Sequence, residues 1–95
     1  MMYLIMWEGN DSLFPKDPEE RKKLIMSFME QTKKSVDDGM LKTYGISVGG
    51  GHGFAVSEQD PKEIYAATST YFPYIRFKIK PMLSIDEAID VMKAM

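Results

Sequence analysis

"SVGGGHGFAV", residues 47–56, decides the fold, because it joins two apolar runs through a cluster of glycines. A phosphate-binding loop needs Lys and then Ser or Thr after its last glycine, followed by a helix. Here the run Phe54–Glu58 follows Gly53, and this run is typical of a strand. The stretch therefore predicts a β-hairpin and not an anion or dinucleotide site, with at least one glycine at positive φ.

Three helix starts flank this hairpin, and two of them share one design. Asp17-Pro18-Glu19-Glu20 and Asp60-Pro61-Lys62-Glu63 each place a capping Asp before a Pro and a Glu. Ser84-Ile85-Asp86-Glu87 is a capping box. Apolar residues at three- and four-residue spacing extend these starts. We expect helices over about Pro18–Asp38 and Pro61–Phe72, and a third helix after Ser84.

Four strands are predicted between the helices. The first is apolar from Tyr3 to Trp7, which is typical of a strand covered on both faces. The last alternates between apolar residues and a basic row of Arg76, Lys78 and Lys80, as in an edge strand protected by charge. The expected bounds are Tyr3–Glu8, Leu41–Val48, Phe54–Glu58 and Tyr74–Lys80.

The order β-α-β, β-α-β predicts a ferredoxin-like α+β fold, βαββαβ plus a C-terminal helix. Right-handed crossovers then place both main helices on one face of a four-stranded antiparallel sheet. We expect residues 1–95 to form a single domain of this kind. The first strand has large apolar groups on both faces, so the second face needs a cover. A second copy of the chain is the simplest cover, and we therefore predict a homodimer.

The element order, the length and the ending "FKIKPMLSIDEAIDVMKAM", residues 77–95, resemble small members of the dimeric α/β-barrel superfamily. Relatives there include muconolactone isomerases, YCII-like proteins and cofactor-free antibiotic-biosynthesis monooxygenases. The resemblance implies that two sheets pack face to face as a barrel, often with a small organic molecule between sheet and helices. It implies no cofactor. No catalytic motif of those enzymes matches positions here, so the resemblance leaves open whether the protein is an enzyme.

Composition narrows the possible partners. The chain has no cysteine, which excludes disulfides, thiol chemistry and thiolate zinc sites. A net charge of −2 gives no long-range attraction for nucleic acid. The N-terminus has neither a basic segment nor a long apolar run, so it predicts neither a signal peptide nor a membrane span. We expect a cytoplasmic protein that binds no metal and no membrane.

Three residues are candidates for a ligand pocket. Arg21 falls at the centre of the apolar face of its helix. There it anchors an anionic ligand, pairs with Glu8 or Glu58, or extends its charged end to solvent from the first turn. Tyr44 is an aromatic strand residue suited to a pocket wall. His52, the only histidine, is the candidate for acid–base catalysis, against a reading as an exposed histidine without an orienting partner.

The connection "GNDSLFPKD", residues 9–17, is a candidate lid over that pocket or a dimer contact, because Leu13 and Phe14 stand among polar residues. Asp11 in this connection and Glu8 before it form a possible acid–base pair.

Two alternative functions are kept beside a small-molecule binder or cofactor-free enzyme. A chain whose interior is filled by side chains would be a non-catalytic interaction or regulatory domain. "HGFAVSE", residues 52–58, matches part of the RNA-recognition signature at Gly53, Phe54 and Ala55, but Val56 stands where a second aromatic residue belongs. An open cavity favours the small-molecule binder, and a positive field on the open sheet favours RNA.

Overall fold

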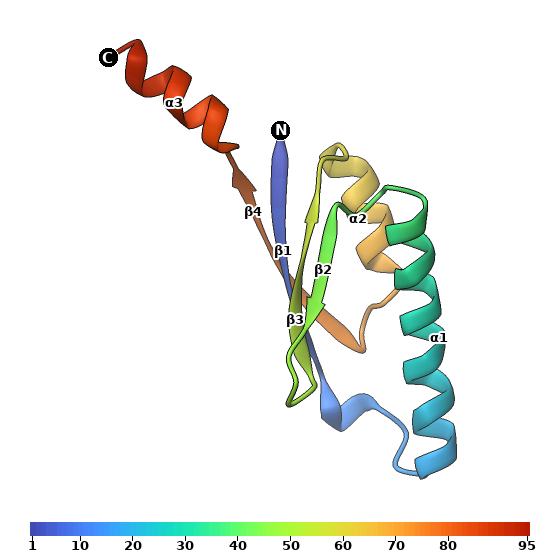
Figure 1. Ribbon diagram of the computed structural model, residues 1–95. Helices are drawn as coiled ribbons and strands as arrows, with labels where there is room; N and C mark the ends of the chain where they lie inside the picture. The colour runs from blue at the N-terminus through green and yellow to red at the C-terminus, as the bar shows by residue number, and fades with distance from the viewer.

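The computed structural model describes residues 1–95 and has the predicted order of elements (Figure 1). The strands form one antiparallel sheet in the order β2-β3-β1-β4. The fold is therefore ferredoxin-like α+β. A short 3-10 helix, η1 (Asp11–Leu13), follows the first strand. The other elements are β1 (Met2–Gly9), α1 (Pro18–Asp37), β2 (Thr43–Ile46), β3 (His52–Ser57), α2 (Pro61–Ser69), β4 (Ile75–Met82) and α3 (Ile85–Lys93).

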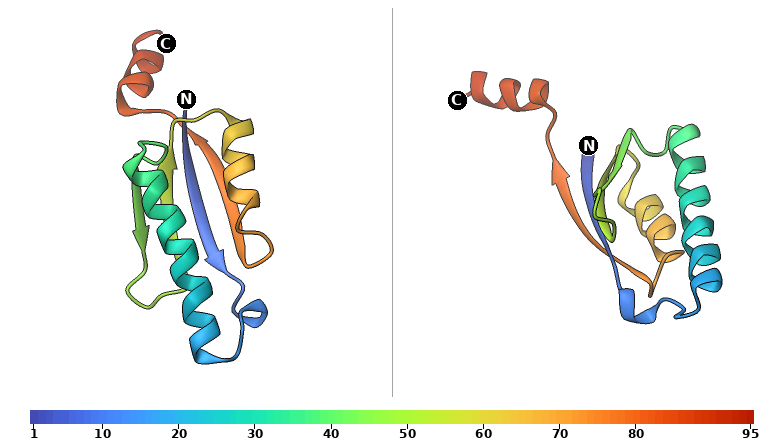
Figure 2. Two further views of the ribbon diagram at one scale, coloured as in Figure 1. Left: turned by 90° about the vertical axis from the view of Figure 1, so that its right-hand side faces the viewer. Right: turned by 60° about the horizontal axis from the view of Figure 1, so that its bottom comes forward.

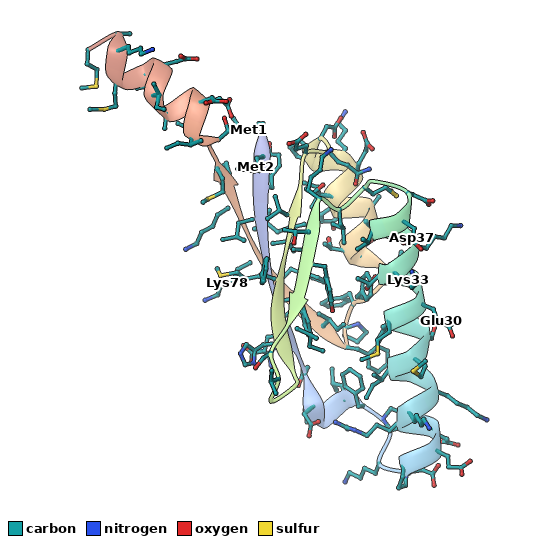
Figure 3. All side chains as sticks on the ribbon, in the orientation of Figure 1. Met1, Met2, Glu30, Lys33, Asp37 and Lys78 are labelled. Carbon is teal, nitrogen blue, oxygen red and sulfur yellow. The ribbon has the colours of Figure 1, made fainter.

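The helices α1 and α2 cover one face of the sheet, as the right-handed crossovers require (Figure 2). The outer surface of α1 carries charged residues such as Glu30, Lys33 and Asp37, whereas Lys78 of β4 lies on the opposite side of the sheet (Figure 3). The helix α3 extends away beyond the end of β4 and covers neither face (Figure 1). This projection gives the protein its long axis, with principal extents of 57 × 24 × 22 Å.

The predicted helix starts are confirmed. Asp17, Asp60 and Ser84 each accept a hydrogen bond from a backbone N–H of the first helical turn. Only Ser84 forms the complete capping box, in which its backbone N–H donates to the Glu87 carboxylate at 3.0 Å. The end of α1 is also as expected, because Gly39 has a φ of 78° and follows the last helical turn.

Several predicted bounds are wrong, most clearly those of α2 and β2. The helix α2 ends at Ser69 and not at Phe72, because the backbone bonds from Thr70 onward span three residues, as in a turn. The second strand is confined to Thr43–Ile46 within the predicted Leu41–Val48. The turn that follows α1 occupies the residues before Thr43, and the hairpin turn begins directly after Ile46.

The glycine stretch forms the predicted hairpin connection. Gly50 and Gly51 have φ values of 77° and 83°. The Gly50 N–H donates to the Ser47 carbonyl at 2.8 Å, and the Ser47 N–H donates to the His52 carbonyl at 2.9 Å. The strand β3 therefore begins at His52, two residues before the predicted start at Phe54, because His52 and Gly53 already pair with β1.

Strand alternation divides the side chains between two faces. On β1, Ile5 and Trp7 face the helices, whereas Leu4, Met6 and Glu8 face the uncovered side. The buried hydrophobic residues number three and lie where β1, β3 and α2 meet: Ile5, Ala55 and Ile64. Partly buried hydrophobic residues pack against this small core: Tyr3, Leu41, Tyr44 and Phe77.

Candidate ligand cavity

A cavity of about 230 Å³ lies between the sheet and the two long helices. It is lined by 25 residues, of which 16 are hydrophobic, from all four strands and from α1 and α2. Protein interiors are normally close-packed, with few voids larger than a water molecule. This protein therefore has an open cavity between its sheet and its helices, beside a small buried core.

Aromatic rings form much of the cavity wall. Trp7 of β1 and Tyr44 of β2 stack with their planes 5° apart and their centroids 5.8 Å apart. Four further rings from the 9–17 connection, α1, the segment after α2 and β4 contact one another along the wall: Phe14, Phe28, Tyr71 and Phe77. Phe14 thus gives the 9–17 connection a place in the wall.

Two phenols add polar groups to this wall. The hydroxyl of Tyr71 lies 2.8 Å from that of Thr32, and the Thr32 hydroxyl lies 2.9 Å from the Phe28 carbonyl. Burial raises the pKa of both Tyr44 and Tyr71 above the ordinary 10.0, and the nearness of Tyr71 raises the pKa of Tyr44 further. Both phenols are therefore uncharged at neutral pH and able to donate a hydrogen bond.

One ion pair lies at the edge of the cavity. The Arg21 guanidinium bonds to the Asp11 carboxylate and lies 5.3 Å from the centre of the Phe14 ring. The Arg21 side chain is 37% exposed and that of Asp11 is 83% exposed, so the pair opens to solvent. The cavity lining contains Arg21, as its place on the apolar helix face indicates.

The partner of Arg21 differs from the prediction. Asp11 pairs with Arg21 in place of Glu8 or Glu58, because η1 folds back beside the first turn of α1. Glu58 instead lies 3.9 Å from Lys42. Asp11 is therefore part of an ion pair and not of an acid–base pair with Glu8.

The other two predicted site residues have different surroundings. Tyr44 lines the cavity. His52 is exposed at the start of β3, opposite Glu8 on the uncovered face, and does not line the cavity. Sequence reasoning missed that Thr32 and Tyr71 bring their hydroxyls together. The available signal was a polar atom on the apolar face of each predicted helix.

The family model described as a domain of unknown function (DUF3303) matches residues 1–95. The chain belongs to this family. A search of the curated proteins found no match. In this DUF3303 chain no helix has both the length and the hydropathy to cross a membrane. Metal-ligating side chains form no group of three in the folded chain.

Proposed function

We propose that this DUF3303 chain is a single-domain protomer of a homodimer that binds a small organic molecule between its sheet and its long helices. The proposal places it in the dimeric α/β-barrel superfamily, as a binding protein or a cofactor-free enzyme. The observation that carries the proposal is the cavity of about 230 Å³ in the position of the core. An interior filled by side chains would instead have favoured a non-catalytic interaction domain.

The uncovered face of the sheet supports the homodimer. Its centre is apolar, with Leu4 and Met6 of β1 beside Phe54 and Val56 of β3. Phe54 is 42% exposed, which leaves a large ring in water in the isolated chain. A contiguous exposed apolar surface of this kind is typical of an interaction site.

Charge complementarity favours a second copy as the partner. The edge strand β4 adds the basic row of Arg76, Lys78 and Lys80 to the uncovered face. The projecting helix α3 carries the opposite charge at Asp86, Glu87 and Asp90. It also exposes an apolar stripe that includes Ile85, Ile89 and Met92. The α3 of one copy therefore offers both apolar surface and negative charge to the sheet of another.

The RNA-binding alternative has one supporting observation, since the same face combines Phe54 with a basic row. RNA-binding sheets of this topology stack two or three bases on aromatic side chains. Here Leu4, Met6 and Val56 surround the one aromatic ring. This surface fits an apolar protein contact better than base stacking.

The proposed cavity is tested by titrating the protein with toluene. Trp7 is the only tryptophan and lines the cavity, so its single indole N–H signal in the NMR spectrum reports occupation. An apolar cavity of about 150 Å³ holds benzene, and toluene therefore fits. We expect a saturable shift of the Trp7 signal.

A matched pair of variants locates the binding. Ala67 lines the cavity, and Ala67→Leu should fill part of it and weaken toluene binding at least tenfold. Ala66 is exposed on the same helix, so Ala66→Leu should leave the binding unchanged. No saturable shift in the unmodified protein, or an equal loss in both variants, would contradict a ligand cavity at this position.

A further inference from the structure

The charges around the cavity point to an uncharged ligand. Of the 25 lining residues only Asp11 and Arg21 carry a charge at neutral pH, and they pair with each other. The pair has no net charge, and the Arg21 guanidinium also lies over the Phe14 ring. An anionic ligand at the cavity edge would meet an ion pair that is already neutral, and an anion deeper in the apolar cavity would remain unpaired at a large cost in free energy.

The volume and the walls point to one aromatic ring. A cavity of about 150 Å³ holds benzene. This cavity, at about 230 Å³, therefore has room for one ring and small substituents. Its walls present a flat stacked pair, Trp7 and Tyr44, and several ring edges. Aromatic rings pack favourably against such faces and edges, in stacked or edge-on contact.

Among the hydroxyl groups of the wall, one is free for a polar contact with a ligand, and the Trp7 indole N–H also lacks a partner in the protein. Six hydroxyls belong to lining residues, and that of Tyr44 has no hydrogen-bond partner in the protein. The other five bond to backbone carbonyls or to each other: Thr32, Ser35, Ser57, Thr68 and Tyr71. Tyr44 is therefore the one hydroxyl of the wall whose hydrogen bonds are all available to a ligand.

We propose that the cavity takes an uncharged one-ring aromatic molecule with a hydroxyl or carbonyl substituent, and that this substituent hydrogen-bonds to the Tyr44 hydroxyl. The ring lies against the aromatic walls, and the Arg21–Asp11 pair remains intact at the cavity edge. This inference rests on the proposed ligand cavity and names the chemistry of its ligand.

Three matched probes test the ligand class at pH 7, with the Trp7 indole signal as the readout. Toluene is apolar, p-cresol adds an uncharged hydroxyl, and p-toluate adds an ionised carboxylate. We expect p-cresol to bind about 3- to 10-fold more tightly than toluene, because a neutral hydrogen bond contributes about that factor. We expect p-toluate to bind most weakly of the three.

Two tyrosine variants test the assignment to Tyr44. Tyr44→Phe should remove the advantage of p-cresol and keep the affinity for toluene within about twofold, because this substitution removes the hydroxyl and keeps the ring. Tyr65 is 76% exposed and does not line the cavity, so Tyr65→Phe should preserve the advantage of p-cresol.

The outcomes separate this inference from the proposed function. Tightest binding of p-toluate would overturn the uncharged class and make Arg21 the anchor of an anion, with the ligand cavity retained. Equal binding of toluene and p-cresol to the unmodified protein would overturn the role of Tyr44, whether or not Tyr44→Phe folds. Failure of all three probes would instead contradict the cavity as a ligand site.

Discussion

The two faces of the sheet carry apolar side chains in opposite surroundings. On the face toward α1 and α2, Trp7 and Phe77 line a cavity that helices enclose. On the other face, Leu4, Met6 and Phe54 form an apolar centre that no element of the chain covers (Figure 2). The apolar side chains of the first face form the core and line the cavity. Those of the second face have no packing partner within one copy of the chain, and we therefore propose that a second copy covers them.

The largest expected effects come from placing the same charge on each face. Phe77 packs against the buried core and lines the cavity, so Phe77→Asp should destabilise the protein by about 4 kcal/mol or more through an unpaired enclosed charge. Phe54 lies on the uncovered face, so Phe54→Asp should cost about 1 kcal/mol in the isolated chain. Chemical denaturation measures both free energies of unfolding.

The same pair of variants tests the homodimer. Sedimentation of the unmodified protein at micromolar concentration should give about twice the chain mass of 10.9 kDa. Phe54→Asp should give the mass of one chain and keep the circular dichroism of the native fold. A single-chain mass for the unmodified protein, or an undissociated Phe54→Asp variant, would contradict the assignment of this face to a second copy.

An intermediate effect is expected from two glycines that have different reasons to be glycine. A Cβ on Gly53 would overlap the Gly45 carbonyl and lie 2.6 Å from the Trp7 ring, so Gly53→Val should cost about 3 kcal/mol or more. Gly50 has open space around it and a φ of 77°, so Gly50→Val should cost only the backbone strain of about 1–2 kcal/mol.

Urea denaturation of both variants measures this difference. The difference also reports how closely the backbone and the Trp7 ring pack at Gly53, beside the cavity. Equal losses in the two variants would mean that both the Gly45 backbone and the Trp7 ring move away from Gly53 at little cost.

Local patterns were enough to predict most of the fold. The caps at Asp17, Asp60 and Ser84 depend only on the next few residues, and so does the positive φ in the glycine hairpin. Helical spacing likewise placed Arg21 on the inner face of α1, because residues three and four apart share a face.

The cavity could not be predicted in this way. Spacing shows which face a side chain occupies, but it does not show whether side chains on facing elements meet. The contact between Thr32 and Tyr71 joins residues 39 positions apart, and the pairing of Arg21 with Asp11 depends on how η1 folds back. The path of α3 away from the sheet could not be predicted for the same reason, because the local sequence of Ile85–Lys93 does not show what that helix contacts.

The smallest expected effect is on the titration of Tyr44 and Tyr71, the two tyrosines that line the cavity. The chain has five tyrosines, and burial raises the pKa of Tyr44 and Tyr71 above 10.0. A raised pKa in the folded state means that the fold holds these phenol protons more tightly than the unfolded chain does. The stabilisation is complete below pH 10 and is lost as the pH rises through the folded-state pKa.

Ultraviolet absorbance of the phenolate should therefore show that Tyr44 and Tyr71 ionise above pH 10, and their contribution to the free energy of unfolding should fall over the same range. Tyr44→Phe should remove one of these two late transitions and leave that of Tyr71. Thr32→Val should raise the pKa of Tyr71 further, because the Thr32 hydroxyl stabilises its phenolate. Ionisation of Tyr44 and Tyr71 at the ordinary pKa of 10.0 in the folded protein would mean that water fills the cavity and reaches both rings freely.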